Sequence, residues 1–392
     1  MMTPFRAVSA ILAAAALAAA ASSCSRRTPP PAPGPEPESA AVPGAAASHA
    51  EEAMTEAARA AAEAAAREAA AEAAEERGRR ARAALESTRG PADPAAALAL
   101  RTPPKSKAAK GKTTGRAPWR GAIAVDAGTG EILFEDGADV PCLPASMVKL
   151  MLLLLVEERV EAGTVRLDDM VAVSTRAYKT GGSQVYLDPR ESFSVEDMLY
   201  AVIVQSANDA AVALAEHVAG SCEAMVALMN RRASELGMRD TVFESVNGLP
   251  ADASAGALDD VTTPRDMAVL SCEICKHPDA LRYTSESYRV FRPEPRLFEM
   301  RTHNPALQTG TRIAGADGLK TGYTRRAGYS LAVSAERAGR RVVAVAMGIA
   351  VADAKGELDV AASKKTRNAR ISELVERAFS TPRSGASGVL EP

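Results

Sequence analysis

Histidine, cysteine and net charge are all scarce in this sequence of 392 residues. The four histidines stand far apart, without the spacing of metal ligands or of a catalytic triad, so we predict no metal site and no cofactor. They are His49, His217, His277 and His303. A formal net charge of -2 gives no reason to expect a nucleic-acid partner. Metal-dependent and nucleic-acid-binding functions are therefore the first to be set aside.

Only five cysteines are present, of which Cys24 lies near the N-terminus and Cys142, Cys222, Cys272 and Cys275 lie further along the chain. Cys272 and Cys275 form a CxxC pair. No second pair and no flanking histidines accompany it, so a zinc site is not expected. For the four later cysteines, both ordinary buried thiols and one disulfide stay open, and no pairing is predicted.

The first 24 residues have the pattern of an export signal. Arg6 precedes an almost entirely apolar, mostly alanine run from 7 to 21, which is too short and too alanine-rich for a membrane-spanning helix. Two processing sites compete: cleavage after the alanines at 19–21, or lipoprotein processing with Cys24 as the lipidated residue. The second lacks the usual branched aliphatic residue three positions earlier. Either predicts a mature protein in the periplasm or cell envelope, and the second adds a membrane tether.

Low-complexity sequence separates this signal from the first folded domain. Residues 25–50 are rich in proline, alanine and glycine and predict a disordered linker. Residues 51–90 consist largely of Ala, Glu and Arg and predict a helix, without the apolar heptads of a strong coiled coil. Residues 91–117 form a basic linker, which we interpret as a solvated tether, with adhesion to an anionic surface as the alternative. Residues 381–392 predict a flexible tail, and the oligomeric state stays open.

Residues 118–380 have the patterns of a folded α+β domain. Strands are predicted at 121–126, 131–135, 288–291, 297–301, 319–323, 329–335 and 341–348. Helices are predicted from about Ser146 and at 195–204, 208–218, 222–236, 264–276 and 364–379. Strands at both ends with helices between them predict an antiparallel β-sheet flanked by helices, with an inserted helical lobe. A cleft between the sheet edge and this lobe is the expected place for a functional site.

Ser146 and Lys149 form the first element that carries chemistry. Pro144 and Ala145 end the preceding segment, and the apolar run after Lys149 predicts a buried helix. A serine and a lysine three residues apart share one helix face, so the amine can serve as a base for the hydroxyl. The free N–H groups of the first turn can stabilise an oxyanion. This SxxK spacing is typical of active-serine acyl transferases, but an isolated match is far more often a helix cap followed by a solvated lysine.

Two further triplets follow in the order that this chemistry requires. Ser206-Ala207-Asn208 lies between two predicted helices, and we prefer it to Ser245-Val246-Asn247, which is more typical of a turn. Lys320-Thr321-Gly322 lies in a predicted strand and is followed by Tyr323, whereas a second copy at 179–181 lies in a glycine-rich loop. We prefer the strand copy because a strand can present a lysine, a hydroxyl and an open backbone edge to a peptide.

Residues 118–380 resemble the low-molecular-weight penicillin-binding proteins that are serine-type D-alanyl-D-alanine carboxypeptidases. Beyond the three motifs, four longer segments resemble family segments in family order: 182–187, 206–211, 262–268 and 317–324. The chain departs from the family at Ala207, where glycine is usual, and at Val246-Asn247, where a histidine often precedes Gly-Leu. None of these departures removes a reacting group.

The resemblance implies that Ser146 attacks the carbonyl between the two terminal D-alanines of a peptidoglycan stem peptide, and that β-lactams bind as inhibitors. Lys149 would be the base, Ser206 would pass a proton to the departing amine, and Asn208 would hold Lys149 and the substrate amide. A base must be neutral, so the pKa of Lys149 has to be lowered. We expect burial and the nearby Lys320 cation to lower it.

Substrate recognition is carried over in the same way. The resemblance implies that Lys320 and Thr321 bind the terminal carboxylate and that Gly322 leaves room for the peptide. The backbone N–H groups of Ser146 and Tyr323 would stabilise the oxyanion.

Three other functions are weighed against the carboxypeptidase. A DD-endopeptidase that cuts peptidoglycan cross-links would use the same residues and is the main alternative. A non-catalytic, wall-binding lipoprotein is the alternative outside the enzymes. A class A β-lactamase is set aside, because no deacylating glutamate in an ExxLN context is found and the second triplet of that class is Ser-Asp-Asn.

Overall fold

The computed structural model describes residues 119–251, 257–292 and 294–382. All of them belong to the second of two compact units, Ala60–Pro392. The predicted signal with Cys24, the two linkers and the alanine-rich helix lie outside the described residues, as does the predicted tail from residue 383 onwards.

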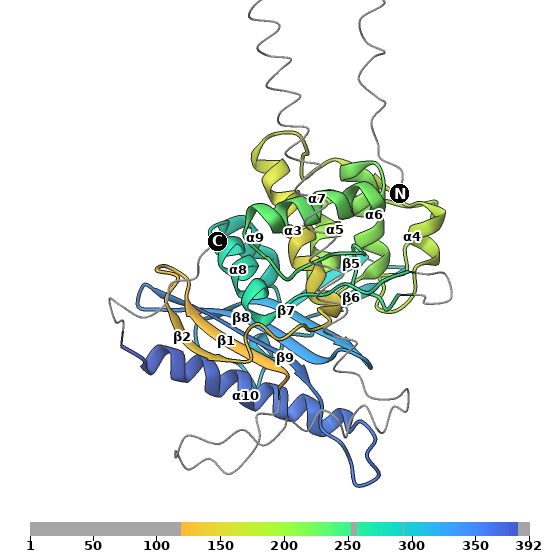
Figure 1. Cartoon of the computed structure of the whole chain (residues 1–392). Coiled ribbons are helices and arrows are strands. Elements are labelled where there is room, and N and C mark those ends of the chain that lie inside the picture. The colour runs from red at the N-terminus through yellow and green to blue at the C-terminus, as the bar shows by residue number, and fades with distance from the viewer. Residues whose placement is uncertain (1–118, 252–256, 293, 383–392) are drawn as a thin grey trace, which may run out of the picture. The chain divides into compact units, whose positions relative to one another are not determined.

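Five antiparallel strands form the main sheet, in the order β2-β1-β9-β8-β7 (Figure 1). They are β1 (Gly121–Asp126), β2 (Ile132–Asp136), β7 (Ala316–Thr324), β8 (Gly328–Arg337) and β9 (Arg340–Ile349). The strands β1 and β2 are the predicted hairpin. Strand β1 also pairs with β9, so the first and last strands of the chain lie side by side within the sheet. The predicted antiparallel sheet is confirmed, and β7 is left as an edge strand.

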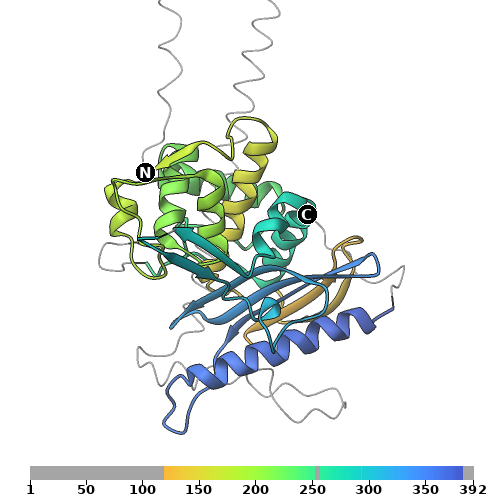
Figure 2. The ribbon, with the colours of Figure 1, turned by 180° about the vertical axis from the view of Figure 1, so that it is seen from behind.

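Each face of the sheet covers its own hydrophobic core. Successive residues of β9 point to opposite faces. Val343 and Val345 therefore lie in the core under the helical lobe, while Val342 and Ala344 lie in the core under α10 (Val360–Ser380). Figure 2 shows α10 lying along one face of the sheet while the helical lobe lies on the other. The predicted layers, with helices on both sides of the sheet, are confirmed.

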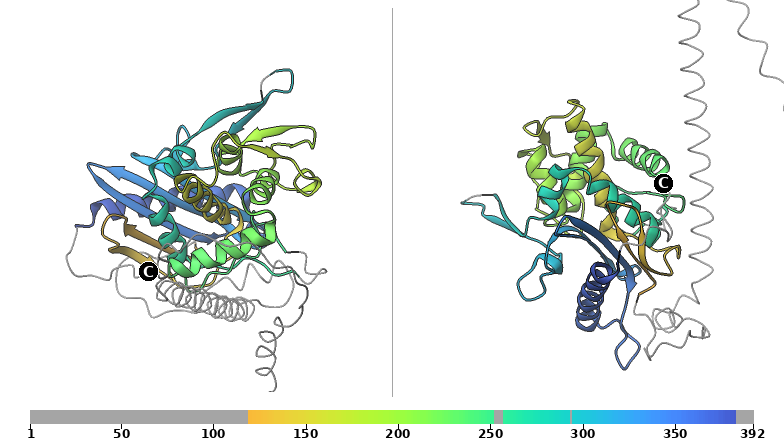
Figure 3. Two further views of the ribbon diagram at one scale, coloured as in Figure 1. Left: turned by 90° about the horizontal axis from the view of Figure 1, so that it is seen from above. Right: turned by 90° about the vertical axis from the view of Figure 1, so that its left-hand side faces the viewer.

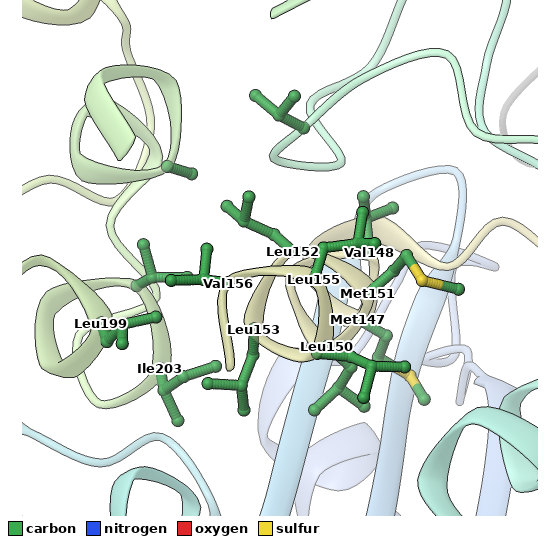
Figure 4. Packing of buried hydrophobic residues seen from close by; sticks show 14 of the residues in the cluster. Met147, Val148, Leu150, Met151, Leu152, Leu153, Leu155, Val156, Leu199 and Ile203 are labelled. Carbon is green, nitrogen blue, oxygen red and sulfur yellow. The ribbon is translucent and has the colours of Figure 1, made fainter. Parts of the chain in front are cut away.

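The helical lobe is built around one apolar helix, α3. Its members are α3 (Lys149–Glu161), α4 (Thr175–Lys179), α5 (Val195–Ile203), α6 (Asn208–Ala219), α7 (Cys222–Glu235), α8 (Pro264–Ile274) and α9 (Pro278–Thr284). Figure 4 shows apolar side chains leaving α3 in several directions, with Leu199 and Ile203 of α5 beside it. Leu150 and Leu152 are completely buried. A helix that is apolar on all sides is buried inside a lobe. Because Lys149 is the first residue of α3, it is buried together with the helix.

The predicted helix at Ser146 differs from the structure in its first turn. A 3-10 helix, η1 (Ala145–Val148), precedes α3, so Ser146 lies in a tighter turn than the apolar pattern indicates. Sequence also missed β3 (Met170–Ala172), β4 (Ser192–Ser194) and the short helices α4 and α9. Elements of three to seven residues are too short to show a period.

Two smaller sheets complete the domain. β3 pairs with β4, and β5 (Tyr288–Arg292) pairs with β6 (Phe298–Arg301) in a hairpin that projects from the domain in Figure 3. Within the described residues no single helix is long and apolar enough to cross a membrane. The bent pair of α6 and α7 passes that test by length and composition only.

Candidate active site

Lys149 lies at the centre of the candidate site. Its amine is 3.0 Å from the Ser146 hydroxyl, 2.7 Å from the side-chain oxygen of Asn208 and 2.7 Å from the backbone carbonyl oxygen of Asn247. The two carbonyl oxygens can take both N–H donors of a neutral amine, which leaves its lone pair for the Ser146 hydroxyl. The side chain of Lys149 is completely buried, while Ser146 is half-buried. Ala145, just before the serine, adopts a positive φ of 48°, which is unusual for a residue with a side chain. The serine is therefore held at a sharply turned helix start, beside an amine that water does not reach.

The surroundings of Lys149 favour its neutral form. Burial is the largest cause that lowers the pKa of Lys149 well below its usual value, and the cation of Lys320 lowers it further. The carboxylates of Asp260 and Asp209 act in the opposite direction but do not outweigh the burial. The expectation that burial and Lys320 depress this pKa is confirmed, and a neutral amine 3.0 Å from the Ser146 hydroxyl has the geometry of a base.

Ser206 and Asn208 come from the turn between α5 and α6. Ser206 has a positive φ of 60°, and Asn208 is the first residue of α6. The Asn208 side chain donates to the carbonyl oxygen of Gly181 at 2.8 Å, and its backbone N–H donates to that of Ser183 at 2.7 Å. Gly182 has a φ of +79°, and a Cβ there would lie 2.5 Å from the Asn208 amide nitrogen. The segment 181–183 thus clamps Asn208, with its side-chain oxygen turned to Lys149.

Lys320 brings the third motif to the same place. It lies on β7, is buried, and donates to the Ser206 hydroxyl at 2.9 Å and to the carbonyl oxygen of Thr321 at 3.1 Å. Burial lowers the pKa of Lys320 to about 7. The Thr321 side chain has no hydrogen bond to another described residue, and Tyr323 is exposed and stacks on Tyr329 with ring centroids 4.2 Å apart. Lys320 therefore connects the edge strand to the Ser206 turn.

Glycine at position 322 lets β7 approach the nucleophile. A Cβ there would lie 2.4 Å from the carbonyl oxygen of Pro144 and 3.1 Å from the Met147 side chain. A Cβ atom does not come within 3.0 Å of a backbone atom in real structures. Any side chain at position 322 would therefore push β7 away from η1. The close approach of Lys320-Thr321-Gly322 to Ser146 thus depends on this glycine.

One member of the site was missed by sequence reasoning. The triplet Ser245-Val246-Asn247, set aside as a turn, is a turn, but its Asn247 carbonyl oxygen accepts from Lys149. Buried Asp260 holds this loop, because it accepts from the backbone N–H groups of Glu244 and Ser245 and from the Ser245 hydroxyl. A backbone carbonyl has no residue-type signature, so only the fold could reveal it.

The preferred motif copies are the ones that converge. Lys149 contacts both Ser146 and Asn208, and Lys320 contacts Ser206, which stands two residues before Asn208. The copy at 179–181 contributes only the carbonyl oxygen of Gly181, and Lys179 ends α4 as an exposed residue.

Candidate metal ligands elsewhere are already engaged. Glu158, Glu273 and His277 approach one another within 4.8 Å. Arg232 donates to Glu158 at 2.8 Å and to Glu273 at 2.9 Å, and His277 pairs with Glu161 at 2.7 Å. A guanidinium thus occupies the position in which a metal ion would balance these carboxylates.

The CxxC pair lies where α8 ends. Cys142, Cys222, Cys272 and Cys275 are free thiols in the structure. Burial raises the pKa of Cys272 and of Cys275, and the Cys275 thiol donates to the Ser334 hydroxyl at 3.3 Å. Because metals bind the thiolate, this environment does not favour a metal site.

An antiparallel sheet with Lys-Thr-Gly on its edge strand, facing a helix that begins with Ser-x-x-Lys, defines the class of active-serine penicillin-recognising proteins. The family model described as D-alanyl-D-alanine carboxypeptidase, peptidase S11, matches residues 110–350. That match covers more than half of the chain, which therefore belongs to this family. The resemblance found in the motifs is confirmed.

Curated relatives carry the same description. The chain is 32% identical over 263 residues to the D-alanyl-D-alanine carboxypeptidase DacF of Bacillus subtilis, covering 67% of this chain and 62% of that protein. It is 36% identical over 236 residues to DacC of Escherichia coli, covering 58% and 56%. The chain thus spans less than two thirds of the length of these relatives.

Solved structures agree on the fold. The chain resembles PBP3 of Streptococcus pneumoniae, a peptidoglycan synthesis regulatory factor, with a TM-score of 0.61 and 28% identity over 68% of this chain and 72% of that one. It resembles penicillin-binding protein D2 of Listeria monocytogenes, solved with ampicillin bound, with a TM-score of 0.57 and 28% identity over 68% and 100%.

Proposed function

We propose that this protein is a serine-type D-alanyl-D-alanine carboxypeptidase that removes the terminal D-alanine from peptidoglycan stem peptides. The observation that carries the proposal is the placement of Lys149, whose buried amine contacts both the Ser146 hydroxyl and the Asn208 side chain. The names of the relatives support the same activity.

The reaction runs through two covalent steps. In the first, the Ser146 oxygen attacks the penultimate D-alanine carbonyl while its proton passes to neutral Lys149. The C–N bond then breaks, and the departing D-alanine amine takes up a proton through Ser206, which Lys320 holds at 2.9 Å. In the second, water attacks the acyl-serine ester, the C–O bond to Ser146 breaks, and the serine regains its proton. No oxidant or metal is required by this balance.

Two backbone N–H groups would stabilise the negative charge that develops on the carbonyl oxygen of the substrate. The N–H groups of Ser146 and Tyr323 flank the point where η1 meets β7 at Gly322. A fixed donor in such a site typically contributes about 3 kcal/mol to transition-state stabilisation. In this proposal, Gly322 lets β7 come close enough to η1 for both donors to reach one oxygen atom.

Recognition of the substrate's end follows from charge. A stem peptide ends in one carboxylate, and the Lys320 amine with the Thr321 hydroxyl supplies a cation and a donor on the edge strand. The peptide would lie along β7 as an added strand. β-Lactams would acylate Ser146 as well; the Listeria protein that this chain resembles is solved in an ampicillin-bound form.

We further propose that the mature protein acts outside the cytoplasm and that Cys24 carries a lipid anchor. The support is the signal-like pattern of residues 1–24 and the proposed substrate, which lies in the cell wall. Metabolic labelling with a palmitate analogue tests the anchor. Label on the wild type and none on Cys24→Ala is expected, and an unlabelled wild-type protein contradicts it.

D-alanine release from a diacetyl-lysyl-D-alanyl-D-alanine peptide, together with labelling by a fluorescent penicillin, tests the enzymatic function. Wild type is expected to show both, and Ser146→Ala neither. Ser192→Ala, a change at an exposed serine of β4, serves as the matched control and should keep both. Retained labelling of Ser146→Ala contradicts the assignment.

A second assay on purified cross-linked dimers separates the two peptidase activities. Cleavage of dimers without release of terminal D-alanine would favour the endopeptidase instead. Penicillin labelling without turnover of either substrate would favour the wall-binding protein.

A further inference from the structure

Arg292, the last residue of β5, is a buried arginine that the proposed reaction does not use. Only 6% of it is exposed, although the hairpin of β5 and β6 projects from the domain (Figure 3). The pairing of β5 with β6 shifts its register between Val290 and Arg292, and the successive residues Phe291 and Arg292 are both buried. A buried guanidinium needs acceptors for its N–H groups. The acceptors of Arg292 therefore show what it holds in place.

These acceptors lie in the loop between α4 and β4. The guanidinium donates to the backbone carbonyl oxygen of Val185 and, at 3.0 Å, to that of Tyr186. It also donates to both carboxylate oxygens of Glu191, at 3.0 and 2.7 Å. Burial by itself would raise the pKa of Glu191, but the hydrogen bond and the charge of Arg292 hold that pKa below its usual value. An ionised glutamate and two backbone carbonyl groups therefore satisfy this arginine.

The part of the loop that Arg292 contacts has an unusual backbone conformation. Tyr186 has a φ of +56°, which a residue with a side chain keeps only where its surroundings hold it. Arg292 holds the carbonyl groups of Val185 and Tyr186. The backbone N–H groups of Val185 and Leu187 donate to the buried carboxylate of Asp209 at 3.2 and 3.1 Å. The loop is thus fixed to β5 through its carbonyl groups and to α6 through its N–H groups.

The same loop reaches the candidate active site through Asn208. The carbonyl oxygen of Gly181 accepts from the Asn208 side chain, and that of Ser183 accepts from its backbone N–H. The side-chain oxygen of Asn208 in turn lies 2.7 Å from the amine of Lys149. Arg292 is therefore connected to the proposed base through the loop and through Asn208, although it belongs to a hairpin on the outside of the domain.

We infer that Arg292 is a positioning residue for the proposed reaction, because it holds the loop 181–187 in the conformation in which Asn208 orients Lys149 toward Ser146. This inference rests on the proposed carboxypeptidase function. Among the described residues, Arg292 has no hydrogen bond to Ser146, Lys149 or Asn208, so it acts through the loop. Its removal should slow the acylation of Ser146 without taking away any reacting group.

The time course of fluorescent-penicillin labelling of the full chain tests this role. The end point of labelling counts the folded, competent sites, whereas the first-order rate constant at saturating penicillin shows how fast each of them reacts. We expect Arg292→Ala to lower this rate constant about tenfold or more, because a small displacement of Asn208 misaligns the base. An arginine that only supported folding would lower the end point and leave the rate constant unchanged.

Arg296→Ala is the matched control. Arg296 also pairs with Glu191, at 2.7 Å, but its side chain is 56% exposed. Within the described part of the chain it has no hydrogen bond to the carbonyl oxygens of Val185 and Tyr186, so its removal should leave the rate constant at the wild-type value.

Arg292→Lys serves as a second variant and decides the matter if Arg292→Ala does not fold. Lysine keeps a cation beside Glu191 but lacks the planar fork that reaches the glutamate and both carbonyl groups at once. Its rate constant should lie between those of wild type and of Arg292→Ala.

Hydrogen exchange tests the step between Arg292 and the base. The backbone N–H groups of Val185, Leu187 and Asn208 donate within this network. They should exchange faster in Arg292→Ala than in wild type, and at the wild-type rate in Arg296→Ala.

The outcomes separate this role from the proposed function. A wild-type labelling rate constant in every folded Arg292 variant overturns the positioning role and leaves the carboxypeptidase standing. The same holds if Arg296→Ala slows labelling as much as Arg292→Ala does, or if exchange of the three N–H groups is unchanged in Arg292→Ala. Absence of both labelling and D-alanine release in the wild type overturns the proposed function, and the positioning role falls with it.

Discussion

The amine of Lys149 donates to the backbone carbonyl oxygen of Asn247 across 2.7 Å. With the Ser146 hydroxyl and the Asn208 side-chain oxygen, this makes three partners for one buried nitrogen. The loop that carries Asn247 is therefore as much a part of the candidate site as the helix that carries the lysine. Five properties of this site can be measured.

Replacing Lys149 tests whether it acts as a base. Lys149→Arg keeps a cation but cannot be deprotonated, so acylation should fall by about 10³-fold or more. The measurement is the rate of fluorescent-penicillin labelling, with the melting temperature recorded to show that the protein is folded. A folded Lys149→Arg protein labelled at the wild-type rate would show that the lysine is not the base.

The pH dependence should have two limbs of opposite sign. Lys149 works as the neutral amine, so kcat/KM should rise with pH through its lowered pKa. Lys320 binds the carboxylate as a cation, so kcat/KM should fall as pH passes about 7. Lys320→Arg, which stays charged, should move the falling limb to higher pH. An unchanged falling limb in that variant would assign it to another group.

Asp260→Asn separates the effect of the Asp260 charge on Lys149 from the hydrogen bonds by which Asp260 holds the loop at Glu244 and Ser245. The amide oxygen can still accept from the N–H groups of Glu244 and Ser245, so the loop should persist. Losing the carboxylate removes a charge that raises the pKa of Lys149, so the rising limb should move to lower pH. Asp260→Ala removes the acceptors as well and should lower kcat at every pH. A rising limb that stays in place in Asp260→Asn would remove Asp260 from the electrostatics of the site.

Asp260 also links stability to pH. Its folded-state pKa is raised to about 6 by burial, so the folded protein binds this proton more tightly than the unfolded chain. Its contribution to stability is therefore fully present below the unfolded pKa of about 4 and is lost as pH rises through about 6. Melting temperatures between pH 4 and 8 should fall less steeply in Asp260→Asn than in wild type.

Gly322→Ala tests the contact between β7 and η1. The added carbon meets the Pro144 carbonyl oxygen at 2.4 Å, so the strand must move. We expect a loss of about 1–3 kcal/mol in stability, together with loss of penicillin labelling. Gly128→Ala, where the nearest atom is 3.5 Å away, is the control and should change neither. Labelling that survives in Gly322→Ala would show that the close approach is not needed.

Sequence reasoning reached those parts of the site in which a side chain carries the chemistry. Ser146 with Lys149, Ser206 with Asn208, and Lys320 were found because each pairs a reactive group with a spacing that helices and strands impose. The choice of Lys320 over Lys179 followed from the strand pattern, and the structure places Lys320 beside Ser206. The fold class followed from strands at both ends of the domain.

Most of the contacts that sequence reasoning missed are made by backbone atoms. The carbonyl groups of Gly181, Ser183 and Asn247 contact Asn208 or Lys149 through atoms that every residue possesses. No residue type marks them. The 3-10 turn at Ser146 was missed because a run of apolar residues gives no sign of where the helix tightens.

The pairing of β1 with β9 bears on how the protein is made. When the ribosome has released the chain only as far as α9, Ser146, Lys149, Ser206 and Asn208 have been made. The second partner of β1, which is β9, and the strand β7, which carries Lys320, have not. Until they have been made, β1 presents an apolar edge that can pair with the wrong strand. Synthesis of the last third of the domain therefore completes the candidate site and, in the same step, covers the exposed edge of β1.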